Sequence, residues 1–136
     1  MDYMKTFLFF ALLTFSTAIL ADIVPGVTDV RIITLEGEKV ELLTNVKGFT
    51  LYTFDPDGAN ETNCYDACAK AWPPILLTPE QVKLVTGDFG VTKRNDGTLQ
   101  LSFDSRPLYL YIGDKKAGQT NGDGLGGVWH IAIDEE

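Results

Sequence analysis

LYTFDPD at residues 51–57 and LYLYIGD at residues 108–114 are two copies of one pattern, and they decide how the rest of the chain is interpreted. Each copy is followed by a tryptophan, Trp72 after the first and Trp129 after the second, at an offset of 57 residues (from 72 to 129). The same offset holds at two further pairs, Asp66 with Asp123 and Leu42 with Leu99. A shared offset at spaced aromatic and acidic positions indicates an internal duplication.

Aromatic side chains alternate within each copy. Residues two apart in a strand face the same way, so Tyr52 and Phe54 share one face, as do Tyr109 and Tyr111. One interpretation is core packing, in which each tyrosine hydroxyl needs a polar partner. The alternative is an aromatic cleft with acidic rims, which suits a cationic or sugar ligand. The binding candidates are the motif residues Tyr52, Phe54, Asp57, Trp72, Tyr109, Tyr111, Asp114 and Trp129.

Strand patterns dominate the rest of the chain and predict a mainly β fold. We expect a single small domain of two pseudo-symmetric hairpin-plus-strand repeats, about 40–76 and 97–133, joined by a connector at 77–90. The predicted strands are Val27–Leu35, Lys39–Thr44, Phe49–Phe54, Thr98–Phe103, Leu108–Tyr111 and Val128–Ile133. The predicted turns are Asn45–Gly48, Asn95–Gly97 and Asp104–Pro107.

One or two short helices are also expected. The first spans Tyr65 to Ala71, with Asn63 as its cap, and the Pro73-Pro74 pair stops it because proline cannot continue a helix. The second begins with threonine at the cap and proline at the first helical position, Thr78-Pro79, and ends by Thr86-Gly87.

The first 21 residues have the pattern of a signal peptide. Residues 6–20 are uncharged and apolar, and small residues close the run at Ala18 and Ala21. Cleavage after Ala21 would start a single mature domain at residues 22–136, and cleavage after Ala18 also fits the pattern. The alternative is an uncleaved membrane anchor. No cysteine directly follows the apolar run, so a lipid anchor is not expected. The mature protein is then secreted or periplasmic and not anchored to the membrane.

The net charge of −8 excludes one class of partner. Removing residues 1–21 takes away one acid, Asp2, and one base, Lys5, so the mature chain keeps that charge. Such a surface repels phosphate backbones, and we expect no nucleic-acid partner.

Two cysteines, Cys64 and Cys68, are four residues apart in a chain predicted to be exported. An oxidising compartment favours a disulfide, and residues at this spacing on a helical turn can approach bridging distance. Metal binding, redox use and free thiols remain alternatives. A redox pair more often has the spacing C-x-x-C.

Weak metal candidates lie in and beside the second loop: Asp114, Asn121, Asp123 and His130. Asn121-Gly122-Asp123-Gly124 is similar to part of a calcium loop, but His130 stands where a bidentate acid should follow. His130 is the only histidine, and one imidazole makes a weak transition-metal site. We therefore expect no cofactor.

No familiar catalytic motif is present, and we do not expect an enzyme. The alternative is a hydrolase that uses Asp57 and Asp114 as an acid–base pair, which requires the two carboxyl groups to lie roughly 5–9 Å apart in a cleft.

The full set of spaced motifs resembles the bacterial exported family called secreted repeat of unknown function, also described as predicted lipoproteins with a Yx(FWY)xxD motif. The first half of the pattern is carried by Tyr52, Phe54, Asp57, Cys64, Cys68 and the Trp72-Pro73-Pro74 run. The second is carried by Pro107-Leu108-Tyr109, Tyr111, Asp114, Gly122–Gly124, Gly126, Gly127 and Trp129-His130. Many relatives carry a lipobox cysteine that this chain lacks. The resemblance implies export and a shared fold.

Together these observations predict an exported, non-enzymatic binding or interaction module of the cell envelope or extracellular space. Its partner would be an envelope protein or a small ligand. The alternative is a metal-handling or redox protein that uses His130, the loop acids or the cysteine pair.

Overall fold

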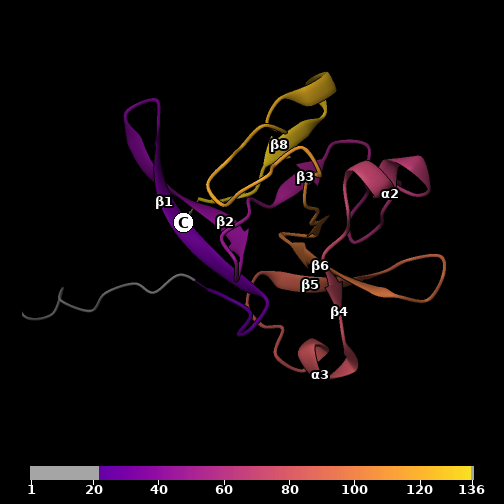
Figure 1. The fold of residues 1–136 in the computed structure, drawn as a ribbon. Helices are drawn as coiled ribbons and strands as arrows, with labels where there is room; N and C mark the ends of the chain where they lie inside the picture. Colours follow the sequence, from indigo (N-terminus) through magenta and orange to yellow (C-terminus); the bar gives the residue numbers. More distant parts are fainter. Residues whose placement is uncertain (1–21, 136) are drawn as a thin grey trace, which may run out of the picture.

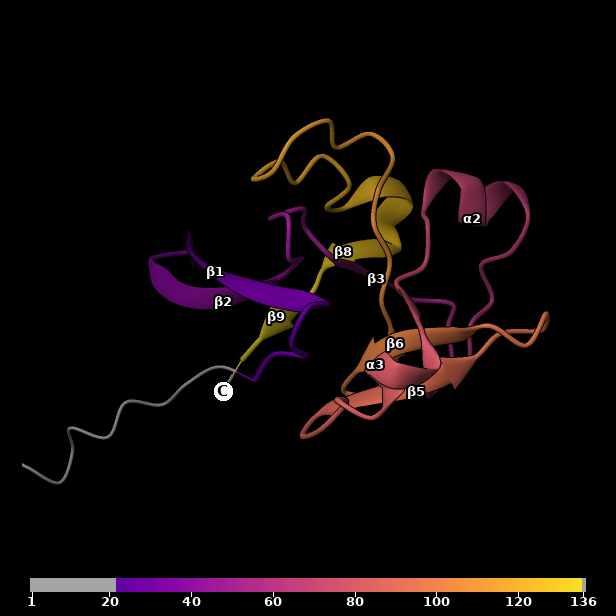
Figure 2. The same cartoon turned by 60° about the horizontal axis from the view of Figure 1, so that its bottom comes forward.

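The computed structural model describes residues 22–135, and these form two small sheets with a two-stranded pair between them (Figures 1 and 2). The first sheet has the order β1 (Thr28–Leu35), β2 (Glu38–Asn45) and β9 (Ile133–Asp134). The second has the order β4 (Leu76–Leu77), β6 (Leu99–Phe103) and β5 (Phe89–Lys93), with β7 (Arg106–Pro107) also pairing β6. The central pair is β3 (Tyr52–Phe54) with β8 (Trp129–Ile131). The short helices are α2 (Ala67–Ala71), α3 (Pro79–Val82) and the 3₁₀ turn η1 (Leu125–Gly127).

The expected mainly β domain with two pseudo-symmetric repeats is confirmed, and the repeats exchange their last strands. In the first sheet, Leu43 of β2 donates its N–H to the carbonyl of Ala132, from the end of the second repeat (2.9 Å). In the second sheet, Leu101 of β6 donates to the carbonyl of Ile75, from the end of the first repeat (2.8 Å). Each sheet therefore contains strands of both repeats, and neither repeat can complete its own hydrogen bonds alone.

The twofold relation passes between Tyr52 and Tyr109. Each donates its backbone N–H to the carbonyl of the other, at 2.8 and 3.0 Å, which is the pairing that two antiparallel strands make about a local twofold axis. Around them, Thr53 pairs with His130 in β3–β8, and Leu110 donates to the carbonyl of Pro73.

The constant offset of 57 residues fails at the hairpins. Leu51 donates to the carbonyl of Leu43, and Leu108 donates to the carbonyl of Leu101, so Leu43 corresponds to Leu101. The predicted equivalence of Leu42 with Leu99 is therefore wrong by one residue. The cause is turn length. The first hairpin turns through Val46, Lys47 and Gly48, whereas the second turns through Asp104 and Ser105, both at positive φ (51° and 67°), as a tight two-residue turn requires.

The core has two parts on opposite faces of the central strands, as the alternation predicted. Leu51 and Leu108 face an aliphatic cluster, and Tyr52 and Tyr109 face an aromatic one. The aliphatic cluster consists of Val24, Val27, Leu43, Leu51, Ile75, Leu77, Phe89, Leu101, Phe103, Leu108 and Ala132. Each repeat supplies residues to both clusters, so the core belongs to the pair of repeats.

Several predicted details need correction. Asn63 does not cap α2, since its side chain donates to the carbonyl of Pro56 and the cap position is Asp66. The Thr78-Pro79 start of α3 is confirmed and includes a capping box, but the α-helix ends at Val82 and tight turns follow.

Two strands were not predicted. β5 begins at Phe89 and Gly90, the end of the expected connector, and continues through residues 91–93, and it pairs with β6 as β1 pairs with β2. The Arg106-Pro107 end of the expected turn is strand β7.

The predicted signal peptide, residues 1–21, lies outside the described residues. Within residues 22–135, no helix is long and apolar enough to cross a membrane.

Candidate functional site

Four aromatic rings from the two repeats form one continuous stack at the centre of the molecule. Trp72 and Trp129 lie face to face, with ring centroids 3.7 Å apart and planes 1° apart. Phe54 stacks on the outer face of Trp129 (4.1 Å), and Tyr111 stacks on the outer face of Trp72 (4.2 Å). Each outer ring thus covers the tryptophan of the other repeat.

The two motif tyrosines also reach across to the other repeat. Tyr52 donates its hydroxyl to Asp114 Oδ2 (2.7 Å), and Tyr109 donates to Asp57 Oδ2 (2.6 Å). Each aspartate uses its second oxygen to accept a loop N–H, from Asn63 at Asp57 (2.7 Å) and from Asn121 at Asp114 (2.9 Å). The motif therefore encodes a reciprocal cross-link in which the tyrosine of one copy binds the aspartate of the other.

Burial shifts the protonation of this network. It raises the pKa of Tyr52 and of Tyr109 far above the ordinary value of 10.0, and the neighbouring carboxylates of Asp114 and Asp57 add to the effect. Burial also raises the pKa of Asp57, although hydrogen bonds from Tyr109 and the Asn63 N–H and the charge of Arg94 act the other way. Neutral tyrosines at neutral pH are what the donor role of both hydroxyls requires.

The centre is packed rather than open. Tyr52 and Tyr109 are 0% exposed, and Trp72 and Trp129 are 7% and 6% exposed. A Cβ on Gly122 would lie 2.7 Å from the Trp72 ring, so even the loop backbone sits directly against the stack. The structure therefore supports the core-packing interpretation for Tyr52, Tyr109, Trp72 and Trp129. The alternative, an open aromatic cleft, does not fit, because side chains fill the space between these rings.

The acid–base pair proposed for a hydrolase is not brought to a common hollow. Asp57 and Asp114 line different hollows, and each carboxylate already binds a tyrosine hydroxyl and a backbone N–H. The structure thus gives both aspartates a positioning role within the fold.

Cys64 and Cys68 form the predicted disulfide, with Cα atoms 5.2 Å apart. Beside it lies a buried residue that the sequence did not single out. Arg94 donates to the carbonyl of Cys64 and to Gln100 Oε1 (both 2.8 Å), and its guanidinium lies 4.6 Å from the centre of the Tyr65 ring. Arg94 thereby ties the disulfide loop to the second sheet.

The weak metal candidates are dispersed in the structure. Asp123 accepts the N–H of Ile131 (3.2 Å), and the Asn121 amide donates to the carbonyl of Gly113 (3.4 Å). His130 pairs with Asp55, with Nε2 2.9 Å from Oδ2, and not with either loop acid. Across the part of the chain that is described, no group of three or more His, Cys, Asp or Glu residues lies together.

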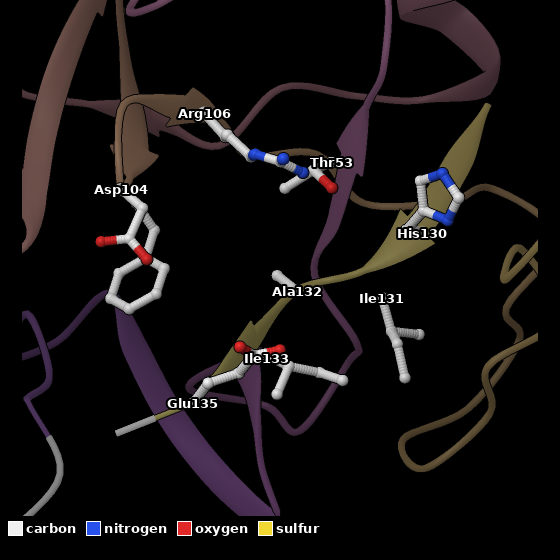
Figure 3. A pocket seen from close by; sticks show the side chains of 9 residues that line it. Thr53, Asp104, Arg106, His130, Ile131, Ala132, Ile133 and Glu135 are labelled. Carbon is white, nitrogen blue, oxygen red and sulfur yellow. The ribbon is translucent and has the colours of Figure 1, made fainter. Parts of the chain in front are cut away.

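A hollow of about 470 Å³, called here the polar hollow, opens between the second hairpin and β8 (Figure 3). Arg106 and Asp104 lie on one side, His130 lies on the other, and Ala132 lies between them. The complete lining is Thr53, Phe103, Asp104, Arg106, His130, Ile131, Ala132, Ile133 and Glu135.

Polar groups in this hollow lack partners. Thr53 is only 7% exposed, and its hydroxyl has no hydrogen bond within residues 22–135. The Arg106 guanidinium, which extends toward Thr53, likewise makes no hydrogen bond or ion pair to any described residue. The Thr53 hydroxyl is not closed off from solvent, since Thr92 Oγ1 is the buried side-chain oxygen that lacks a partner among the described residues. The Thr53 hydroxyl and the exposed Arg106 guanidinium are therefore both free to bind a ligand in the polar hollow.

The twofold relation generates a second hollow, of about 430 Å³, which is called here the apolar hollow. Its lining is Asn45, Lys47, Phe49, Pro73, Leu110, Tyr111, Ile112, Asp114 and Lys115. The hydrogen-bond pattern matches four of its residues to residues of the polar hollow: Leu110 with Thr53, Pro73 with His130, Phe49 with Arg106, and Asn45 with Phe103. Ile112 corresponds to Asp55, which does not line the polar hollow but pairs with His130.

The two hollows have therefore diverged in chemistry. Leucine, proline and phenylalanine replace threonine, histidine and arginine, and Ile112 replaces the partner of His130. Among the matched pairs, Asn45 is the exception, because it is polar where the polar hollow has the apolar Phe103. Its carboxamide oxygen accepts the N–H groups of Lys47 and Phe49 in its own turn. Because the same backbone accommodates apolar residues at these positions, the fold does not require the polar set.

Comparison with known proteins agrees with this architecture. A family model described as secreted repeat of unknown function matches residues 34–75 and 90–133, which are the two repeats of the structure. No curated protein and no solved structure matches the chain. The match covers more than half of the sequence and both copies of the motif, and the chain belongs to the family of secreted repeats of unknown function.

Proposed function

We propose that this protein is an exported, non-enzymatic binding module and that its ligand site is the polar hollow. The observation that carries the proposal is that the Thr53 hydroxyl and the Arg106 guanidinium both line the polar hollow and have no hydrogen-bond partner among the described residues. A hydroxyl and a guanidinium without protein partners can donate hydrogen bonds to a ligand that enters the hollow.

The divergence of the two hollows supports the same proposal. A leucine stands at the equivalent of Thr53, and a phenylalanine stands at the equivalent of Arg106, so an apolar alternative exists within the same molecule. A polar set that the backbone does not require is consistent with selection for binding.

Binding without catalysis fits the surroundings of His130. Its described hydrogen-bond partner is Asp55, and no hydroxyl or thiol among residues 22–135 is hydrogen-bonded to it. A nucleophile activated by a neighbouring base would need such a contact. The family is described as secreted, and we place the module in the extracellular space or in the periplasm, with a small ligand or an envelope protein as its partner.

Affinity enrichment of small molecules tests the proposal. The mature protein, residues 22–136, is immobilised and exposed to the low-molecular-mass fractions of culture medium and of envelope extract. Eluted compounds are identified by mass spectrometry. The comparison protein is Thr53→Leu/Arg106→Phe, called here the symmetrised variant, because each substitution introduces the residue of the apolar hollow.

The expected result is at least one compound that the natural protein enriches and the symmetrised variant does not. Ile112→Thr is the matched control, since it changes an exposed residue (56%) of the apolar hollow and should keep the enrichment. Equal enrichment by the natural protein and the symmetrised variant, with both folded, would refute the polar hollow as the site.

A further inference from the structure

We infer that the polar hollow binds a zwitterion that carries a carboxylate and an ammonium group on the same carbon, as a free α-amino acid does. The inference rests on the proposed function and names the ligand class for that site. It follows from the distribution of charge around the hollow, in which cationic and hydrogen-bonding groups and acidic groups occupy different positions over an apolar floor (Figure 3).

We place the carboxylate of the ligand at the end of the hollow lined by Arg106, Thr53 and His130. A guanidinium presents a planar fork of donors that matches a carboxylate, and that of Arg106 is unpaired in the described structure. Thr53 adds a hydroxyl donor, and Figure 3 shows the Arg106 side chain directed toward it. His130 faces the hollow from β8, with its Nε2 held by Asp55.

The ammonium end is set by Asp104 and Glu135, which line the hollow away from His130 (Figure 3). Neither carboxylate forms an ion pair or hydrogen bond with a described residue. Burial and the nearby negative charges of Asp88 and Glu135 raise the pKa of Asp104, while Arg106 opposes the change. A cation placed here would relieve the repulsion between the acids.

The remaining lining restricts the ligand further. Phe103, Ile131, Ala132 and Ile133 provide apolar surface for a side chain, and about 470 Å³ is within the usual range for small-molecule sites. A multiply charged anion such as phosphate is disfavoured, because Asp104 and Glu135 face it and the net charge is −8. A ligand of zero net charge avoids this repulsion and still satisfies Arg106.

NMR titration of the full mature protein tests the charge requirement with defined probes. The first probe is L-leucine, which has both charges and an apolar side chain. L-Leucinamide lacks the carboxylate, and N-acetyl-L-leucine lacks the ammonium group. L-Lysine, L-glutamate and glycyl-L-leucine extend the set. The readout is the saturable shift of the backbone amide signals of Thr53, Arg106 and Ala132.

The expected result is saturable binding of at least one zwitterionic amino acid, with affinity at least about tenfold weaker for each singly charged leucine derivative. Arg106→Gln should reduce the zwitterion affinity at least about tenfold and remove the preference over leucinamide. Asp104→Asn should instead reduce the ratio of the affinity for L-leucine to the affinity for N-acetyl-L-leucine, because it removes a carboxylate proposed to bind the ammonium group. Ile112→Thr, in the apolar hollow, should leave all affinities unchanged.

Two results would overturn the inference. One is equal binding of the zwitterion and either derivative, and the other is no localised shift with any zwitterionic probe. Neither result refutes the proposed function. The polar hollow would still be supported as a ligand site if the enrichment experiment found another compound whose binding depends on Thr53 and Arg106. Conversely, if the symmetrised variant bound the zwitterion as well as the natural protein does, the proposed site itself would be refuted.

Discussion

The aromatic centre and the two hollows lie on the same twofold relation, yet the repeats match at the centre and differ at the hollows. At the centre, the tyrosine–aspartate hydrogen bonds and the ring stacking of one repeat have counterparts in the other. Tyr52 binds Asp114 as Tyr109 binds Asp57, and Phe54 covers one tryptophan as Tyr111 covers the other. At the hollows, equivalent positions carry opposite chemistry.

This difference separates what the fold requires from what it permits. A residue at the centre contacts the other repeat, so a change on one side destabilises both. A residue that lines a hollow contacts open space on one side and can diverge without that cost. The Tyr, aromatic and Asp positions of the motif therefore hold the two repeats together, whereas Thr53 and Arg106 of the proposed ligand site lie outside the motif.

The largest expected effect comes from separating the repeats. Fragments 22–86 and 87–136 each lack the exchanged strand that completes their sheet, and neither should fold alone. Each fragment should give a narrow range of amide proton shifts by NMR, and mixing the two should restore the dispersed spectrum. A dispersed spectrum from either fragment alone would show that a repeat is an independent folding unit.

The next largest effect is expected from truncating the stack. Trp72→Ala and Trp129→Ala should each lower the free energy of unfolding by about 3–5 kcal/mol, since a buried ring and its cavity are involved. Urea titration followed by far-ultraviolet circular dichroism measures this without relying on tryptophan fluorescence. The two losses should agree within about 1 kcal/mol. A loss below 1 kcal/mol at either position would contradict an equally shared centre.

The cross-links should show smaller but equally matched effects. Tyr52→Phe and Tyr109→Phe should each cost about 1–3 kcal/mol, because each removes the hydroxyl donor of one aspartate, which keeps only its loop N–H donor. Thr53→Ser, which keeps its hydroxyl on the opposite face of β3, is the matched control and should cost less.

The same tyrosines predict the response to alkali. Their pKa values are higher in the folded protein than in the unfolded chain, where tyrosine titrates near 10. Stability should be full below about pH 10 and should fall above it, by about 1.4 kcal/mol per pH unit for each buried tyrosine. Each Tyr→Phe variant should remove one such contribution. An unchanged slope in both variants would show that other groups cause the loss.

An effect of similar size is expected at the disulfide, where the repeats differ. The first loop is closed by Cys64 and Cys68, whereas the equivalent second loop contacts the centre through Gly122, whose N–H donates to Tyr52. Reduction should cost about 2 kcal/mol, the value expected for a short closed loop. Denaturant titration with and without reductant measures it. Complete unfolding on reduction would mean that the bridge holds the whole domain.

The sequence predicts the parts of this structure that local patterns determine. Alternation placed the aromatic rings and Leu51 on opposite faces, the Thr78-Pro79 pair marked the start of α3, and the cysteine spacing indicated the disulfide. Comparison of the two sequence copies also identified the motif residues. These features depend on residues within a few positions of one another.

The parts that were missed depend on partners far away in the chain. β5 is a strand because β6 pairs with it, and the strand exchange joins Leu43 to Ala132. The constant offset hid the one-residue difference in length between the two hairpin turns. The offset of 57 does pair Phe49 with Arg106, but the polar hollow draws its residues from β3, the second hairpin and β8, so the sequence does not show that these residues line hollows.

The symmetrised variant Thr53→Leu/Arg106→Phe tests the central claim most directly, by measuring its free energy of unfolding and its compound enrichment together. The account predicts a free energy of unfolding within about 1 kcal/mol of the natural protein, since the apolar hollow already holds these residues, together with loss of the enriched ligand. A folded variant that retains the ligand would contradict the claim. So would a loss of stability as large as that of the tryptophan variants.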